Sequence, residues 1–379
     1  MSKLHKVVLA MLALGAVLGL AACGGGDGGL EEGSDGGGDA EVAAAKPIGG
    51  EWTISNWPLY IDKQTVADFD KEVGATTKYI EDINDNFEFF GKLRPQLQNG
   101  ESGGRSMFVV TDYMANIMHE LGYLQDLDES AIPNAENLLP SLESPTHDPN
   151  RDYSLPWQTG FTGIIINKDL APEIDSIEDL FDPKYKGKVT FLGDMYDDVT
   201  LVMKMQGVDP ADATEEEWNK AIDEIAEAAD SGQIRDFTGN AYADDIVKGD
   251  IVAAVGWSGD AIQLQADNPN VEWIRPAEGC NVWSDNMVIP VGAENPGTAQ
   301  AFMNYVYDPE NQAQIAEYVN YVTPVEGTKE VLAKKDPKLA DNQLIFPDDK
   351  FTEDCTPQAI PDPEFEDAVT EKYQSVITG

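Results

Sequence analysis

Four short motifs in the chain combine aromatic rings with polar or acidic side chains, a mixture that suits a ligand with both apolar and charged parts. Three of them follow directly on predicted strands, and the fourth precedes one: Asn56-Trp57-Pro58-Leu59-Tyr60, Thr111-Asp112-Tyr113 and Trp257-Ser258-Gly259, then Trp283-Ser284-Asp285. In open α/β sheets, ligands bind in the crevice at the carboxyl ends of the strands. Aromatic residues make up only 9% of the chain, so their concentration at strand ends predicts a ligand site with aromatic walls.

Motifs for catalysis and for metal binding are absent from the sequence. There is no GxSxG, P-loop or HExxH motif, and the chain has only three histidines. The stretch Asp82-x-Asn84-x-Asn86 resembles the start of a calcium loop, but Phe87 occupies the turn position that needs glycine and Leu93 replaces the bidentate acid. We therefore expect no catalysis, no metal and no cofactor.

The balance of charges restricts the class of partner. Acidic residues outnumber basic ones by 69 to 25 in 379 residues, which gives a formal net charge of −44. This excludes a general nucleic-acid binder, because few cations are available to neutralise phosphates. The charge points instead to a cationic ligand, to high solubility or to a salty habitat, three readings that composition does not separate.

The N-terminus has the pattern of a bacterial lipoprotein signal. Lys3 and Lys6 precede an apolar run over 7–20, which is short for a membrane span and typical of a signal peptide. The run ends in Leu20-Ala21-Ala22-Cys23, which is similar to a lipobox. We expect a signal peptide over 1–22, a lipidated Cys23 and a flexible Gly- and acid-rich tether over 23–50. The protein would then be extracytoplasmic, in the periplasm or on the cell surface, and anchored to the membrane by its lipid.

Two further cysteines, Cys280 and Cys355, lie in the body of the chain. In an oxidising exterior an isolated pair is more often bridged than free, so we expect a disulfide between them. On the chain-entropy model such a bridge contributes about 4 kcal/mol of stability. The alternative, two free thiols, stays open.

Strands and helices alternate along the rest of the chain. Periodicity predicts strands over 51–55, 76–80, 107–110, 163–167, 188–192, 234–237, 251–256 and 287–290, and helices over 64–73, 87–97, 199–206, 215–229, 242–248, 260–266, 298–307 and 309–318, with another from about 114. This alternation predicts an α/β architecture, and its length suggests two sheets.

The four motifs, in this order, resemble those of the spermidine/putrescine-binding proteins of bacterial ABC transporters, within the extracellular solute-binding family. Other matching stretches are Val109-Val110-Thr111-Asp112-Tyr113-Met114, Asp152-Tyr153-Ser154-Leu155-Pro156-Trp157, Asp182-Pro183-Lys184-Tyr185-Lys186-Gly187, Gly193-Asp194-Met195-Tyr196-Asp197 and Tyr321-Val322-Thr323-Pro324. The resemblance implies a two-lobed, periplasmic-binding-protein-like α/β fold of type II, in which each lobe is a mixed sheet flanked by helices and the ligand cleft lies between the lobes. Lobe 1 would comprise 51–160 plus 286–329, and lobe 2 would comprise 161–285 plus 330–379.

The resemblance also implies the residues of the site. The aromatic walls would be Trp57, Tyr60, Tyr113, Trp257, Trp283 and Tyr321, the carboxylates of Asp194, Asp197 and Asp285 would hold amines, and Thr111 would add a hydroxyl. A C-terminal amide would join them from within 354–379, at a position that the sequence does not give. The ligand would be a polyamine, the protein a monomer without enzymatic activity, and its partner an ABC transporter permease. The residue types agree, because a methylene chain needs apolar walls and its ammonium groups need carboxylates.

Several alternatives stay open at this point. The sequence does not separate putrescine from spermidine, and the same fold could bind a sugar or another organic cation. A non-transport sensor could be built on the same receptor. A tethered hydrolase could use a carboxylate pair such as Asp194 and Asp285.

Overall fold

The computed structural model describes residues 48–362 and 364–379. The expected signal peptide, the lipidation at Cys23 and most of the expected tether lie outside the described residues. No helix within the described ranges is long and apolar enough to cross a membrane.

Ten strands of the described chain form one hydrogen-bonded sheet, whose main path runs β2-β1-β3-β9-β4-β7-β5-β6. The strands are β1 (Gly50–Asn56), β2 (Ala75–Glu81), β3 (Met107–Thr111), β4 (Ser154–Asn167), β5 (Val189–Phe191), β6 (Ile234–Phe237), β7 (Ala253–Trp257), β8 (Val271–Ile274), β9 (Cys280–Val288) and β10 (Cys355–Pro357). Strands β1–β3 are parallel to one another, and β5–β7 form a second parallel group. The mixed α/β architecture expected from the sequence is confirmed, and the two expected sheets are joined into one.

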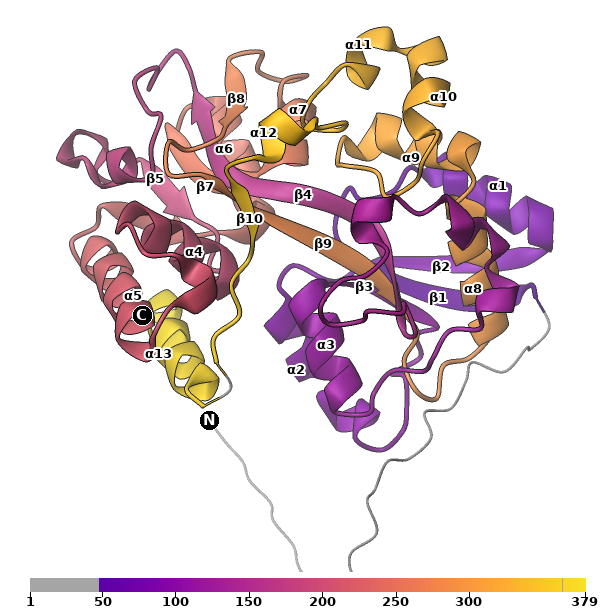
Figure 1. Ribbon diagram of the computed structural model, residues 1–379. Coiled ribbons are helices and arrows are strands. Elements are labelled where there is room, and N and C mark those ends of the chain that lie inside the picture. Colours follow the sequence, from indigo (N-terminus) through magenta and orange to yellow (C-terminus); the bar gives the residue numbers. More distant parts are fainter. Residues whose placement is uncertain (1–47, 363) are drawn as a thin grey trace, which may run out of the picture. The chain divides into compact units, whose positions relative to one another are not determined.

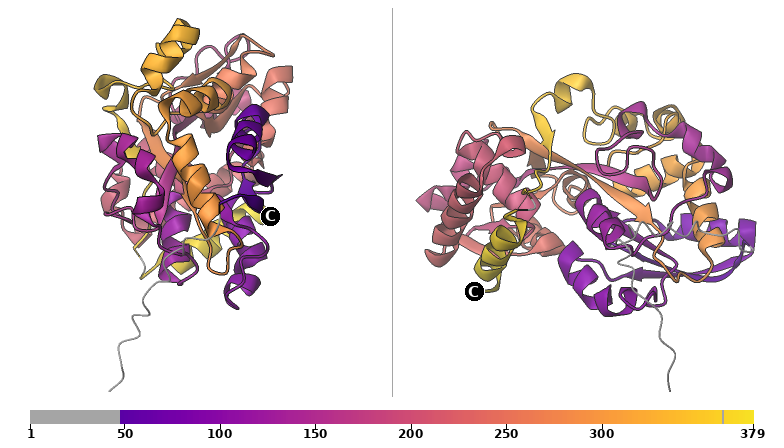
Figure 2. Two further views of the ribbon diagram at one scale, coloured as in Figure 1. Left: turned by 90° about the vertical axis from the view of Figure 1, so that its right-hand side faces the viewer. Right: turned by 60° about the horizontal axis from the view of Figure 1, so that its bottom comes forward.

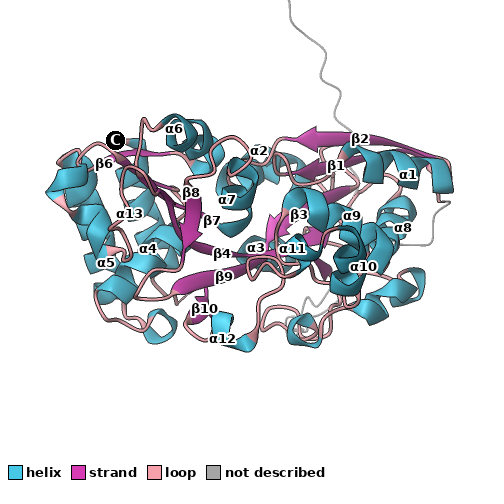
Figure 3. Cartoon of the chain, turned by 90° about the horizontal axis from the view of Figure 1, so that it is seen from above, coloured by secondary structure: helices cyan, strands magenta, loops and turns pink. Residues whose placement is uncertain are grey.

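Strands β4 and β9 join the two parallel groups. They pair antiparallel with each other, β9 also pairs with β3, and β4 also pairs with β7. Figure 3 shows both strands running between the helices around α4 and α5 and those around α1 and α8. Any residue at the middle of these two strands therefore lies between the two groups of elements.

Strand β9 corrects one expectation from the sequence. A strand was predicted over 287–290, but β9 begins at Cys280, so Trp283 and Asp285 lie inside it rather than before it. The hydrophobicity pattern does not show this strand, because three of its buried residues are polar. Asn281, Ser284 and Asn286 are buried, and each has a hydrogen-bond partner. In the register with β4, Trp283 is opposite Gly160 and Asp285 is opposite Gln158.

Helices cover the sheet. They are α1 (Lys63–Val73), α2 (Asn86–Leu97), α3 (Asp112–Glu120), α4 (Met195–Met205), α5 (Glu215–Asp230), α6 (Tyr242–Lys248), α7 (Ser258–Leu264), α8 (Pro296–Val306), α9 (Pro309–Val319), α10 (Thr328–Lys335), α11 (Pro337–Ala340), α12 (Asp349–Thr352) and α13 (Glu366–Thr378). In Figure 1, helices α4, α5 and α13 gather at one end of the sheet, and α1, α8 and α9 gather at the other.

Acidic N-caps start the helices that matter for the site. The Asp85 side chain accepts the Glu88 N–H at the start of α2, and Asp194 accepts those of Tyr196 and Asp197 at the start of α4. Such caps satisfy N–H groups that have no partner inside the helix. Because Asp194 caps it, α4 begins earlier than the predicted start at residue 199.

Helices α10 and α11 pack beside α9. Residues 330–379 were assigned to lobe 2, but Leu332 of α10 and Ala340 of α11 pack in one apolar cluster with Ala313 of α9. Helix α9 lies in the segment 286–329, which was assigned to lobe 1. The chain thus follows α9 through α10 and α11 and returns to the sheet at β10.

The C-terminal segment is fastened to β9 and α5. Cys355 is bonded to Cys280 by a disulfide, and β10 runs parallel to β9 from that point. Helix α13 then packs beside α5, where the ammonium of Lys372 lies 2.6 Å from the carboxylate of Asp223. Figure 2 shows the yellow C-terminal helix beside the red helices of α4 and α5.

Candidate functional site

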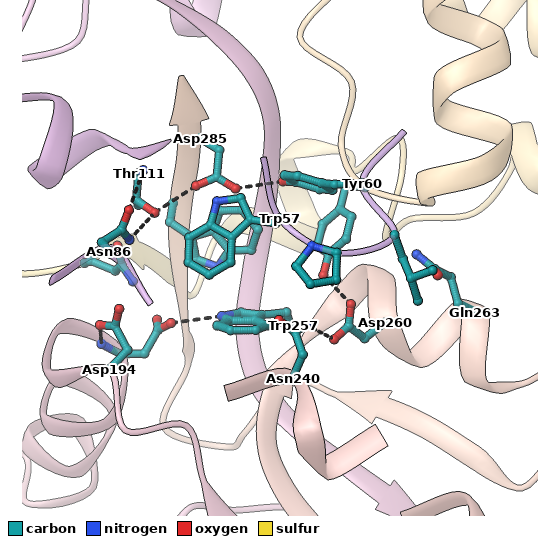
Figure 4. A pocket seen from close by; sticks show the side chains of 16 residues that line it. Trp57, Tyr60, Asn86, Thr111, Asp194, Asn240, Trp257, Asp260, Gln263 and Asp285 are labelled. Atoms are coloured by element: carbon teal, nitrogen blue, oxygen red, sulfur yellow. Dashed lines mark hydrogen bonds between the residues drawn. The ribbon is translucent and has the colours of Figure 1, made fainter. Parts of the chain in front are cut away.

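One pocket gathers most of the residues singled out from the sequence. The space between its lining atoms is about 510 Å³, part of it open to solvent. Nine of the ten predicted ligand residues line it: Trp57, Tyr60, Thr111, Asp194, Asp197, Trp257, Trp283, Asp285 and Tyr321. Figure 4 shows that the labelled side chains point toward one another from several elements.

The pocket forms where strands of both parallel groups end. Trp57 follows β1, Thr111 ends β3, and Trp257 ends β7. Asp194 comes three residues after the last residue of β5, and Asp285 lies in β9. Residues far apart in sequence meet here because the sheet brings these strands side by side.

Aromatic rings form continuous walls. The ring centroids of Trp57 and Trp257 lie 6.2 Å apart, and those of Trp257 and Trp283 lie 6.5 Å apart, both edge to face. Tyr321 continues the wall, with its ring centroid 5.6 Å from that of Trp283 and 5.3 Å from that of Tyr60. Such faces pack against methylene groups and attract ammonium groups.

Two glycines make room for these rings. A Cβ atom built on Gly160 would lie 2.4 Å from the Trp283 ring, and one built on Gly259 would lie 2.4 Å from the Tyr321 ring. Real Cβ atoms do not come so close to another heavy atom. Glycine at these positions therefore allows the Trp283 and Tyr321 rings to pack against the backbone.

Asp285 lies at the centre of a small hydrogen-bond network. Its carboxylate accepts the hydroxyl of Tyr60 at 2.9 Å and that of Thr111 at 2.8 Å, both bonds being within the usual range. Burial raises the pKa of Asp285 to about 7, although the two hydroxyls lower it in part. Burial thus disfavours the charged form of this carboxyl, and a cationic partner would offset the desolvation of that form.

Asp194 and Asp197 stand together at the start of α4. The carboxylate of Asp194 accepts the Tyr113 hydroxyl at 2.8 Å, and that of Asp197 accepts the indole N–H of Trp257 at 3.1 Å. Burial and the neighbouring charge of Asp197 raise the pKa of Asp194 well above its usual value. Burial also raises the pKa of Asp197.

Asp260 is a fourth pocket carboxylate, which the sequence analysis missed. It accepts hydroxyl groups from Tyr242 at 2.6 Å and Tyr321 at 2.7 Å, and the amide of Asn240 at 2.9 Å. Burial raises its pKa, and these bonds lower it in part. Its position three residues after Trp257 is the one signal in the sequence that could have identified it. In the sequence, however, Asp260 looks like the first residue of the helix predicted over 260–266.

The pocket has no positive side chain of its own. Among the described residues that line it, four are aspartates and none is Lys, Arg or His. Isolated buried carboxylates are costly unless they are paired or protonated. The arrangement therefore favours a ligand that carries more than one positive charge.

Two predicted residues have supporting positions. Tyr113 does not line the pocket: it lies behind Asp194, donates to it, and stacks on Tyr196 at a centroid distance of 4.1 Å. The Thr111 hydroxyl lines the pocket but donates to Asp285 and accepts the amide of Asn86 at 2.9 Å. Both hydroxyls donate to pocket carboxylates, Thr111 to Asp285 and Tyr113 to Asp194.

The pocket also contains residues that the sequence motifs did not mark. These are Pro58, Leu59, Asn86, Asn240, Gln263 and Gln358. Gln358 lies within 354–379, the stretch in which a C-terminal amide is expected, and its side chain helps to lower the pKa of Asp197. It lies three residues after the disulfide at Cys355, and its backbone N–H donates to the Val282 carbonyl at 3.1 Å.

A sheet whose strand ends converge on one aromatic, acidic pocket defines a protein that binds a small solute. The model of the bacterial extracellular solute-binding protein family matches residues 64–345. The chain belongs to this family, which confirms the family expected from the motifs.

Several relatives are named for polyamines. The chain is 26% identical over 295 residues to the spermidine/putrescine-binding periplasmic protein of Escherichia coli (strain K12), covering 77% of this chain and 82% of the relative. It is 27% identical over 347 residues to the putrescine-binding periplasmic protein PotF of the same organism, covering 86% and 91%. A solved structure from Listeria monocytogenes, named as a candidate spermidine/putrescine ABC transporter, has a TM-score of 0.76 at 27% identity and covers 86% of this chain and 98% of that one.

Proposed function

We propose that the protein is an extracytoplasmic, lipid-anchored solute-binding protein that captures a polyamine and delivers it to an ABC transporter permease. The observation that carries this proposal is the pocket with four buried aspartates, aromatic walls and no Lys, Arg or His among its described lining residues. A polyamine supplies what the pocket lacks, because its ammonium groups offset the buried carboxylates and its methylene groups pack on the rings.

The same geometry argues for binding without chemistry. Each pocket carboxylate holds hydroxyl, indole or amide donors in this structure. A carboxylate pair acting on a scissile bond would need one member free to move a proton and room for water beside the other. Blank results in a hydrolase activity screen would support this reading, and turnover of a substrate would contradict it.

We propose that the two parallel groups of strands, with their helices, are lobes that close on the ligand. The first lobe would comprise 51–160 plus 286–329, extended by α10 and α11, and the second would comprise 161–285 and the chain from β10 onward. Strands β4 and β9 cross between them, so bending of these strands is the simplest hinge. Asp285 lies on β9, where closure would bury a bound ammonium.

The lipid anchor has its own test. Substitution Cys23→Ser should release the protein into the soluble fraction, because a thioether-linked lipid cannot form on serine. Retention of this variant in the membrane fraction would contradict the lipobox interpretation.

Isothermal titration calorimetry with putrescine and spermidine tests the ligand class. We expect saturable binding of at least one of them, weakened by high salt because the attraction is between charges. A neutral sugar and a zwitterionic amino acid serve as comparison ligands. A sugar suits aromatic walls as well, but it would leave four carboxylates without a counter-charge. Binding of the sugar alone would refute the polyamine assignment.

Delivery to a permease and sensing are separated by a genetic test. Deletion of the neighbouring permease gene should abolish polyamine uptake that depends on this protein. Unchanged uptake would favour a sensor built on the same receptor.

A further inference from the structure

A second hollow adjoins the binding pocket. The space between its lining atoms is about 870 Å³, part of it open to solvent, and it shares Trp57, Asp194, Asn240 and Trp257 with the pocket. These four shared residues place the hollow directly beside the pocket. A ligand longer than the pocket would reach this hollow next.

The lining of the hollow includes one further acidic residue and several apolar ones. Beyond the shared residues, Asp85, Phe237 and Ile377 are among the residues that line it. Asp85 belongs to the segment before α2, whereas Phe237 ends β6 and Ile377 lies in α13. No Lys, Arg or His is among the described residues that line it.

Asp85 and Asp194 approach each other from opposite groups of elements. Asp85 caps α2, with its Oδ1 atom accepting the Glu88 N–H at 2.7 Å, and Asp194 caps α4. The charge of Asp85 contributes to raising the pKa of Asp194, and burial raises the pKa of Asp85 itself. A Cβ built on Gly239 would lie 3.5 Å from the Asn84 carbonyl oxygen, so the loop before α6 borders the segment that carries Asp85.

We propose that this hollow, the extension subsite formed by Asp85, Asp194, Phe237 and Ile377, binds an additional ammonium group of an elongated polyamine such as a triamine or tetraamine. The inference rests on the proposed function, and it concerns the length of the ligand. A diamine is held within the main pocket. A longer chain lays its methylene groups along Phe237 and Trp57 and places its next ammonium between the carboxylates of Asp85 and Asp194.

The decisive experiment compares putrescine, spermidine and spermine by isothermal titration calorimetry on the purified protein and on Asp85→Asn. Asparagine caps helices as well as aspartate does, so this variant removes the charge and retains the start of α2. We expect spermine affinity to fall about tenfold, which corresponds to about 1.4 kcal/mol, while putrescine affinity stays within threefold. Spermidine should lose affinity if its third amine reaches the subsite, and otherwise it should behave as putrescine does.

Two further variants separate direct contact from a general effect of charge. Asp236→Asn removes an exposed carboxylate beside Phe237, and it should leave the ratio of spermine to putrescine affinity unchanged. Phe237→Ala removes apolar surface without changing charge, and it should weaken spermine alone.

Equal losses for all three ligands in Asp85→Asn, or no loss for any of them, would overturn the extension subsite while leaving the polyamine assignment intact. Failure of the unmodified protein to bind any of the three would instead refute the proposed function.

Discussion

Substitution Asp285→Asn should make the ligand-free protein more stable at neutral and alkaline pH while it removes polyamine binding. The carboxyl is buried, and its pKa is raised from 3.8 to about 7 in the folded protein. Because the pKa is higher in the folded protein, the fold prefers the protonated carboxyl. The stability that the protonated carboxyl retains at low pH is therefore lost as pH rises through about 7. At about 1.4 kcal/mol per pKa unit, the ionised carboxylate costs the empty fold about 4 kcal/mol at pH 8.

Asparagine is neutral throughout and retains the shape of the side chain. It still accepts one hydroxyl, from Tyr60 or Thr111, and donates to the other, at a cost of about 1 kcal/mol for the poorer bond. Urea unfolding without ligand should therefore show a gain of about 3 kcal/mol at pH 8. This gain should shrink by about 3 kcal/mol and nearly vanish at pH 5, because the wild-type carboxyl is then protonated in the fold.

The same substitution, Asp285→Asn, should weaken polyamine binding although it stabilises the ligand-free protein. Loss of one partner of a buried charge pair costs about 2–5 kcal/mol, which is a loss of about 30- to 4000-fold in affinity. Calorimetry with the ligand that binds the parent protein measures it. The exposed Asp349 of α12 supplies the control, because Asp349→Asn should change neither stability nor affinity. Polyamine binding within threefold of the parent, or a variant less stable than the parent at pH 8, would refute this account of Asp285.

Three further predictions concern the same pocket. Polyamine affinity should fall as pH is lowered from 8 to 6, by up to about tenfold per unit for each carboxyl that must lose a proton; titration in buffers of different ionisation enthalpy should reveal proton release, and a flat profile would contradict it. Reduction of the Cys280–Cys355 bond should weaken polyamine binding severalfold in still-folded protein, because the bond holds Gln358 at the pocket; unchanged affinity after reduction, with both thiols titrated, would refute this link. Gly259→Ala should lower affinity at least tenfold, because its Cβ would displace the Tyr321 ring; titration with the parent's ligand measures this, and an unchanged affinity would show that the ring has room to move.

The aromatic part of the site is predictable from the sequence because it depends on local signals. Trp57 follows β1, whereas Thr111 and Trp257 are the last residues of β3 and β7. Parallel strands end at one edge of a sheet. The acidic surplus indicates a cation but not which carboxylates meet it, since any of 69 acidic residues qualifies. For Asp194 and Asp285 the choice came from the family resemblance.

Other parts of the site depend on tertiary structure that the sequence does not encode locally. Asp260 looks like a helix start, and only the fold brings it to Tyr242 and Tyr321. Gln358 is placed by the pairing of β10 with β9, which joins segments separated by 75 residues. The course of β9 was missed because its buried polar residues are satisfied by distant partners.

The hydrogen bonds of the pocket couple ligand charge to closure of the proposed lobes. Tyr113 of α3 donates to Asp194 of the other group of elements at 2.8 Å, and Tyr321 donates to Asp260 at 2.7 Å. Opening of a hinge at β4 and β9 would break both bonds, each of which contributes about 1.5–3 kcal/mol as a hydrogen bond to a charged group. Ionisation of the four carboxyls strengthens these hydrogen bonds, but it also increases the repulsion between the carboxylates. In the empty protein the hydrogen bonds therefore favour the closed state, while the repulsion between the carboxylates opposes it. A bound polyamine neutralises the repulsion between the carboxylates and leaves the hydrogen bonds intact. The closed state with ligand is then favoured both by the hydrogen bonds and by the attraction between ammonium groups and carboxylates.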